Sequence, residues 1–147
     1  PRTTSAEKLS LAASDTVYTY HCHCTHLLLA TTTPLPALPV RQNSLDKAHI
    51  MPLPPAPTAH TRFSQEPKAV NHYGLLLSTA LDGSAEMMQT DDGYEKRYLQ
   101  RCGRCNVPVG YHLDWLQFEQ KEKSGRREDL VYLFPGGLVS TSEMVMG

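Results

Sequence analysis

Four cysteines form two close pairs that lie far apart in the chain. One residue separates Cys22 from Cys24, two separate Cys102 from Cys105, and the chain has no other cysteine. Zinc binds four thiolates in a tetrahedron, and two short cysteine turns can supply two each. The second spacing is a standard zinc half-site, whereas the first is tighter than usual. We therefore expect one structural Zn²⁺ bound by Cys22, Cys24, Cys102 and Cys105.

Other chemistry is open to the same residues. Disulfides are one alternative, although nothing in the chain resembles a secretory signal peptide. A redox dithiol at the second pair is another, but such dithiols open a helix, and Val107-Pro108-Val109 is typical of a strand. Histidines also surround the first pair, and each is a possible replacement ligand: His21, His23 and His26. Because four thiolates complete the shell, we expect the histidines to flank the site.

The segments around both pairs predict a mainly β protein. Short apolar and aromatic runs lead into and out of each pair, so each cysteine turn is expected at the tip of a hairpin. The predicted fold is a small zinc-stabilised β-fold of two strand–knuckle–strand units with pseudo-twofold character. Further strands are expected at 75–77 and 129–134, with Leu138 and Val139 pairing back after a turn. Residues 81–93 are expected to form a loop.

Composition suggests one domain with long loops. We expect a flexible arm at 1–14 and a single zinc-binding β domain at 15–147, which includes a Pro-rich connection at 34–70 and a charged insertion or short helix at 116–129. A short strand or turn is expected at 45–51. Eleven prolines limit the core, so the metal should contribute to folding. The formal net charge of −1 gives no global basic field, and no apolar run is long enough for stable membrane insertion.

A local basic cluster lies beside the second pair, at Lys96, Arg97, Arg101 and Arg104. Four cations on a rigid turn can contact RNA phosphates. The alternative is a solvated strand face balanced by Glu95, Asp91 and Asp92. Enzymatic activity is not expected, because four cysteines leave zinc no open position and no nucleophile–base arrangement or phosphate loop is apparent.

Several motifs, in order, resemble the STING ER exit protein family, and we expect a fungal relative. These motifs are Tyr20-His-Cys22-His-Cys24, then Leu38-Pro39-Val40-Arg41 with Asp46 and Ile50, then residues 95–111 around the second pair, and 130–139. The family usually has Gly after each cysteine pair, where this chain has Thr25 and Asn106. Asn tolerates the left-handed conformation that Gly would supply, whereas Thr25 leaves the first turn uncertain in geometry.

The resemblance implies a small adaptor that docks on a large protein or ribonucleoprotein assembly. Members are found with spliceosomes, which favours a nuclear, spliceosome-associated protein in pre-mRNA splicing. The alternative, also implied by the family, is a cytoplasmic or ER-associated adaptor that promotes export of a membrane protein from the endoplasmic reticulum to the Golgi.

Overall fold

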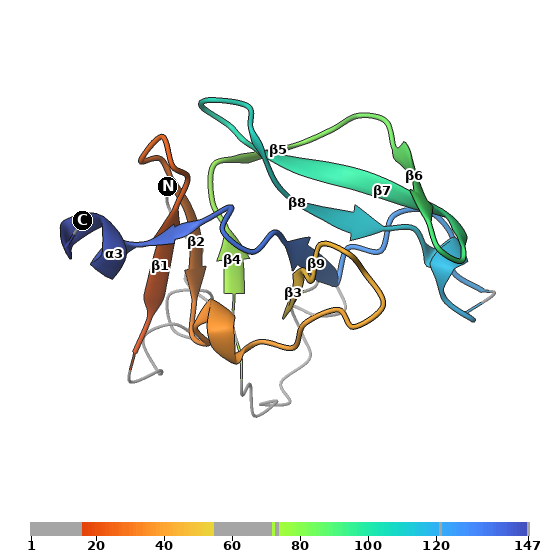
Figure 1. Ribbon diagram of the computed structural model, residues 1–147, viewed down its shortest axis with the longest axis horizontal. Coiled ribbons are helices and arrows are strands. Elements are labelled where there is room, and N and C mark those ends of the chain that lie inside the picture. Colours follow the sequence, from red (N-terminus) through yellow and green to blue (C-terminus); the bar gives the residue numbers. More distant parts are fainter. Residues whose placement is uncertain (1–15, 55–71, 73, 121, 147) are drawn as a thin grey trace, which may run out of the picture.

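The computed structural model describes residues 16–54, 72, 74–120 and 122–146, and it is mainly β, as predicted. Two antiparallel sheets make up the fold (Figure 1). The smaller sheet has the order β10-β1-β2-β4, formed by Val139–Ser140, Tyr18–His21, Leu27–Thr31 and Gly74–Leu76. A short helix, α3 (Thr141–Met146), follows β10 directly.

The larger sheet has six strands in the order β3-β9-β8-β7-β5, with β6 also paired to β7. These strands are β3 (His49–Pro52), β5 (Thr79–Leu81), β6 (Glu86–Thr90), β7 (Gly93–Cys102), β8 (Pro108–Leu113) and β9 (Leu130–Leu133). Two 3₁₀ turns, η1 (Leu35–Ala37) and η2 (Trp115–Gln117), lie in the connections. Since β7 is ten residues long, β6 and β5 can pair with its two ends along the same edge.

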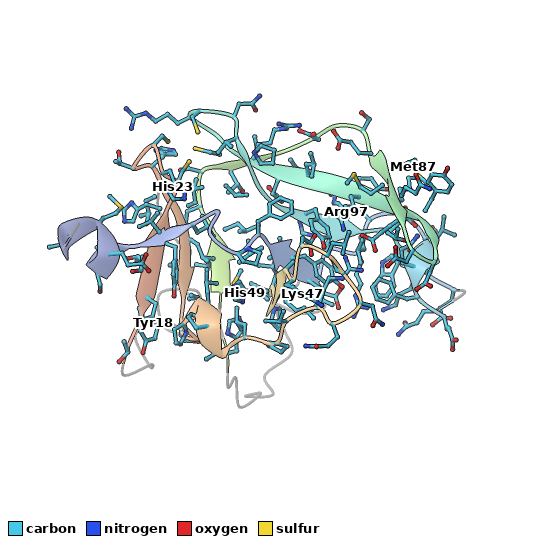
Figure 2. The ribbon with its side chains drawn as sticks, viewed as in Figure 1. Tyr18, His23, Lys47, His49, Met87 and Arg97 are labelled. Atoms are coloured by element: carbon cyan, nitrogen blue, oxygen red, sulfur yellow. The ribbon has the colours of Figure 1, made fainter. Side chains whose placement is uncertain are left out.

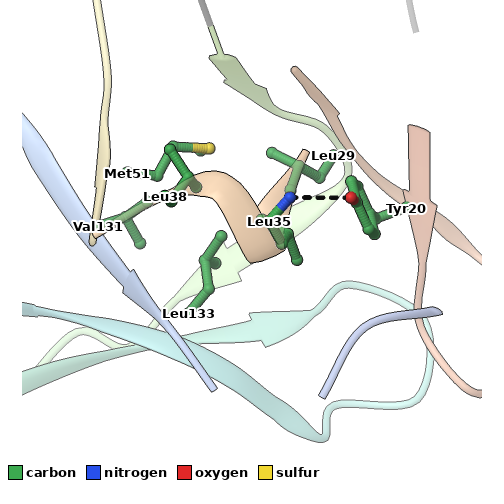
Figure 3. Close-up of a cluster of buried hydrophobic side chains, with 7 residues drawn as sticks. All are labelled: Tyr20, Leu29, Leu35, Leu38, Met51, Val131 and Leu133. Atoms are coloured by element: carbon green, nitrogen blue, oxygen red, sulfur yellow. Dashed lines mark hydrogen bonds between the residues drawn. The ribbon is translucent and has the colours of Figure 1, made fainter. Parts of the chain in front are cut away.

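The main hydrophobic core joins the two sheets (Figure 3). Tyr20 and Leu29 from the smaller sheet pack with Leu35 of η1 and with β3 and β9 of the larger one. The Tyr20 hydroxyl accepts a hydrogen bond of 2.9 Å from the Leu35 backbone N–H, so the polar end of this buried ring is satisfied. Alternation along β9 buries Val131 and Leu133 in this cluster.

The structure corrects several predicted elements. The expected loop at 81–93 contains β6, which lies between a bend at Gly83 and Ser84 and a turn at Asp91 and Asp92. β10 pairs with β1 and not with the preceding strand. Within 116–129 the described residues form no helix beyond the end of η2, and the segment is held by a bridge between Asp114 and Arg126.

The predicted Pro-rich connection lies only partly within the described residues. The first part of the Pro-rich connection, 34–54, contains η1 and β3, and Ile50 donates to the Pro39 carbonyl at 2.8 Å. The predicted arm at 1–14 and residues 55–70 of that connection lie outside the described residues. Strands were predicted correctly at 75–77, at 129–134 and on both sides of the second cysteine pair, within a residue or two.

Candidate metal centre

The four cysteines converge on one point between the two sheets. All four Sγ atoms lie within 4.8 Å of one another. The contacts run between the pairs: Cys22 Sγ lies 3.4 Å from Cys105 Sγ, and Cys24 Sγ lies 3.7 Å from Cys102 Sγ. A tetrahedron with metal–sulfur bonds of about 2.3 Å has edges of about 3.8 Å. The four thiols therefore fit a tetrahedral metal ion.

Two hairpins hold the cysteines with similar backbone hydrogen bonds, and the second turn is one residue longer. In the β1–β2 turn, Cys22 N–H donates to the His26 carbonyl at 2.9 Å, and Thr25 N–H donates to the Cys22 carbonyl at 2.8 Å. In the β7–β8 turn, Cys102 donates to Val107 and Asn106 donates to Cys102, each at 2.9 Å. A shift of register precedes each turn. Both turns therefore direct their first cysteine inward.

Both turns close on a residue in the left-handed region. Thr25 has φ 81° and Asn106 has φ 67°. These are the two positions where the family pattern suggested Gly. Asn adopts this conformation readily, whereas the branched Cβ of Thr makes it costly. The first turn thus carries backbone strain that the second largely avoids.

The second turn also docks on the chain where it crosses between the sheets. Gly103 N–H donates to the Ser78 carbonyl at 2.9 Å, and Ser78 lies in the connection from β4 to β5. A Cβ on Gly103 would lie 2.5 Å from that carbonyl oxygen. Glycine is therefore required here by the close approach of two backbones.

The protein environment shifts the pKa values of Cys22 and Cys102 in opposite directions. Burial raises the pKa of the Cys22 thiol to about 12. Burial acts in the same direction at Cys102, but backbone N–H groups of Cys105 and Arg104 outweigh it and bring the pKa of Cys102 to about 7. One of these is the Arg104 N–H, 3.4 Å from Cys102 Sγ. Four thiolates at one point need a bound cation, which would supply the missing positive charge.

The alternatives to a metal site find less support. All four cysteines are free thiols, and the closest sulfur contacts join different hairpins. A disulfide needs sulfurs about 2.05 Å apart. Cys102 and Cys105 lie at the end of a strand hairpin and not at the start of a helix, as a redox dithiol would.

The neighbouring histidines flank the thiol group, which contains none of them among the described residues. His21 Nδ1 donates to the Thr25 carbonyl at 3.0 Å, and its Nε2 accepts from the Thr141 hydroxyl at 2.9 Å. His23 Nε2 donates to the Gly136 carbonyl at 2.7 Å, which links the first turn to the β9–β10 connection. These contacts give two of the three histidines structural roles.

The predicted basic cluster does not form one patch. Arg97 is only 9% exposed, because alternation along β7 turns it to the same buried face as Glu95 and Leu99. Lys96 lies 3.7 Å from an Asp114 carboxylate oxygen, and Arg101 pairs with Asp82 at 2.8 Å. Arg104 is exposed in the second turn. The phosphate-contact role stays a prediction for the other three, but Arg97 is unavailable for it.

Arg97 instead belongs to a buried polar network that the sequence analysis missed. Its Nε donates to Glu95 at 2.6 Å, and Arg41 forms a two-pronged pair with the same carboxylate at 2.7 and 3.1 Å. The Tyr111 hydroxyl accepts from Arg41 and donates to Asp46. Two guanidinium groups thus balance two carboxylates, and Figure 2 shows Arg97 between β7 and the segment that carries Lys47. The network fixes the 41–47 segment to the larger sheet.

A cavity of about 510 Å³ opens beside this network. It is lined by the 41–47 segment, by the end of β6 with its turn, and by Glu95 and Arg97. No helix among the described residues is long and apolar enough to cross a membrane.

Comparison with family models matches residues 12–147 to the STEEP1 domain. No curated protein matches the chain. The match spans both cysteine hairpins, the buried network and all ten strands of the structure, in agreement with the resemblance seen in the sequence. The chain belongs to the STEEP1 domain family.

Proposed function

We propose that the chain is a non-enzymatic adaptor whose fold is stabilised by one structural Zn²⁺ bound to Cys22, Cys24, Cys102 and Cys105. The observation that carries this proposal is the convergence of four thiols from hairpins of both sheets at tetrahedral spacing. Four thiolates suit zinc and leave it no open position for a substrate or an activated water. His21 and His23 beside the site bind backbone carbonyls of Thr25 and Gly136.

The metal is tested by elemental analysis of the purified, reduced protein. One zinc per chain is expected, with Zn–S distances near 2.3 Å by X-ray absorption. Structural zinc with four protein ligands resists substitution by other ligands. Added small anions should therefore leave the zinc X-ray absorption spectrum unchanged. Iron at the site, or less than one metal for every two chains with the fold intact, would contradict the proposal.

For the cellular role, we propose an adaptor that promotes export of a membrane protein from the endoplasmic reticulum. Membership in the STEEP1 domain family supports this role, which the sequence resemblance gave as its alternative. The nuclear, spliceosome-associated role stays a prediction from that resemblance, as does the fungal source. Neither role requires a reaction at the metal.

Both roles are separated by purifying the tagged full-length protein from its own cells and identifying the proteins that accompany it. ER-export proteins and an ER-associated location would support the proposal. Spliceosomal proteins and a nuclear location would replace it with the splicing role. For the substitutions compared in this experiment, Gly83→Ala is the control variant, because a Cβ on Gly83 meets no atom within 4 Å.

The same experiment tests the cationic contact. Arg104→Glu changes an exposed charge in the rigid second turn, and Lys123→Glu changes an exposed one that lies over the Trp115 ring at 4.5 Å. If a ribonucleoprotein is the partner, Arg104→Glu should reduce its recovery more, since a fixed turn loses less entropy on docking. Equal losses would place recognition elsewhere.

A further inference from the structure

The outer edge of β6 is the least protected strand edge in the described part of the chain. β6 pairs with β7 along one side only, and its first four side chains are exposed. It has five residues, whereas the other edge strands have two to four. Unpaired N–H and C=O groups along such an edge are a ready template for another strand.

The other edges are shorter or are flanked by neighbouring segments, and β5 has only three residues. The 39–40 segment runs along β3, which also ends in Pro52. β4 begins with two buried residues, and α3 follows β10 without a gap. β6 has the sequence Glu-Met-Met-Gln-Thr, with no Pro, no Lys and no shift of register against β7. Glu86 is its one charged side chain, and three features that commonly protect an edge strand, Pro, Lys and a bulge, are absent from it.

The surroundings of β6 supply apolar contact and negative charge. Met87 is 61% exposed at the periphery of the molecule (Figure 2), and Met88 is 39% exposed beside the cavity. Asp91 and Asp92, both exposed, form the turn at the end of the strand and also line the cavity. With Glu86, residues 86–92 carry three acidic side chains and no basic one.

We propose that β6 binds an extended peptide segment of a partner protein by strand addition, and that this segment carries apolar side chains with a Lys or Arg at one end. The backbone of the segment pairs with the outer edge of β6. Apolar side chains contact Met87 and Met88, and those on the second face enter the cavity against Leu45. The basic side chain lies against Asp91 and Asp92.

Charge also disfavours a second copy of this chain as the occupant. Antiparallel pairing of two β6 strands about Met88 places Glu86 of one copy opposite Thr90 of the other. Glu86 of each copy then lies next to Asp91 of the other copy, so the two-fold symmetric dimer contains this like-charge contact twice. Like charges at neighbouring cross-strand positions destabilise a sheet, so a basic segment suits the edge better than a copy of β6.

This inference rests on the proposed adaptor function and gives it a docking strand. The test uses the zinc-loaded protein and three synthetic peptides: Lys-Val-Thr-Ile-Thr-Val-Lys, the same peptide with Glu at both ends, and the Lys peptide N-methylated at alternate residues. Binding is followed by fluorescence anisotropy and by amide chemical shifts. The Lys peptide should bind with a dissociation constant below about 1 mM and shift the amides of residues 86–92.

The two other peptides separate backbone pairing from charge. N-methylation removes the donors along one edge and should weaken binding at least about tenfold. The Glu peptide should bind about fivefold more weakly or worse, and Asp91→Asn with Asp92→Asn should weaken the Lys peptide by a similar factor. Glu119→Gln with Glu122→Gln, two exposed acids outside 86–92, removes the same charge and should leave binding unchanged.

Several results would overturn the proposal. They are the absence of amide shifts at β6 with about 1 mM Lys peptide, equal binding of the N-methylated or Glu peptide, and concentration-dependent dimerisation through β6. Co-purification of the full-length protein tests the adaptor function separately. If an Asp91→Asn, Asp92→Asn variant still recovers its partners, the adaptor function is supported and the strand-addition role of β6 is refuted.

Discussion

Glu95→Gln tests how much the buried polar network contributes to the fold. Glu95 is 5% exposed and accepts three hydrogen bonds from two guanidinium groups. The substitution keeps the size of the side chain but removes its charge and one acceptor. Asp46, which lies 3.3 Å from Arg97, is then the remaining carboxylate of the network, so one positive charge is left uncompensated.

Removal of one partner from a buried ion pair typically costs about 3–5 kcal/mol. We expect a value near the lower end, about 3 kcal/mol, because the Arg41 and Arg97 side chains keep 16% and 11% of their surface exposed. Stacking over Tyr111 and Tyr132 also remains available to them. A loss of that size is a large fraction of the stability of an ordinary domain.

The assay is urea unfolding of the zinc-loaded protein, followed by tyrosine fluorescence and circular dichroism. Glu119→Gln, at an exposed position, is the control and should change the free energy of unfolding by less than about 0.5 kcal/mol. A double-mutant cycle of Glu95→Gln and Arg41→Gln isolates the interaction free energy between Glu95 and Arg41. A loss below about 1 kcal/mol for Glu95→Gln, or strict additivity in the cycle, would refute the reasoning.

The network also predicts how stability depends on pH. Burial alone would raise the pKa values of both carboxyls, but hydrogen bonds and charges of Arg41 and Arg97 hold the pKa of Glu95 below its usual range. Hydrogen bonds from Ser44, Tyr111 and Ala48 and the charge of Arg97 do the same for the pKa of Asp46. A carboxyl with a lowered folded pKa contributes stability that is present above its unfolded pKa and is lost as pH falls through its folded pKa. Stability should therefore fall below about pH 4, and less steeply in Glu95→Gln.

Three further predictions concern the metal hairpins. Cys102→Ser, or a strong chelator, should lower the melting temperature by more than about 10 °C in a thermal scan, because metal binding free energy is folding free energy; an unchanged transition would show that the site is not structural. Thr25→Gly should raise the free energy of unfolding by about 1 kcal/mol in urea, since it relieves the strained φ of 81°; a loss of stability would contradict this reading of the turn. Gly103→Ala should cost more than about 2 kcal/mol because its Cβ would lie 2.5 Å from a backbone oxygen, whereas Gly83→Ala, which meets no atom, should cost little; equal effects would show that the second turn tolerates displacement.

The metal centre was largely accessible from the sequence because its signal is local. Paired cysteines at short spacing identify a half-site without knowledge of the fold, and strand-forming residues on both sides place it in a hairpin. The family pattern also singled out Thr25 and Asn106, and both adopt the left-handed conformation that Gly would supply. What these local signals did not give is the partition of the two hairpins between two sheets.

The buried network was not accessible in the same way because its partners are distant in sequence. Arg41 and Glu95 are 54 positions apart, and neither resembles a core residue by type. Alternation did offer one signal: Glu95, Arg97 and Leu99 share a strand face, so a buried Leu99 implies buried neighbours. The basic residues were instead grouped by their closeness in sequence, which mixed the two faces of β7.

The β6 strand was missed for a related reason. Glu-Met-Met-Gln-Thr has no alternation of apolar and polar residues, because an edge strand exposed on both faces has no buried side to mark. Asp82, Gly83, Asp91, Asp92 and Gly93 around it gave the whole segment the composition of a loop. Pairing with β7 at regular register, and not propensity, makes it a strand.

β7 links the two polar features that hold the fold together. Its first half carries Glu95 and Arg97, which fix the 41–47 segment, and its last residue is Cys102, which joins the metal hairpins. Cys102 lies seven positions after Glu95 on this extended strand, a span of about 24 Å. The network and the metal therefore anchor opposite ends of one long strand, and β6 pairs along its first half at fixed register. An edge strand supported in this way is already ordered before a partner arrives, which lowers the entropy cost of strand addition.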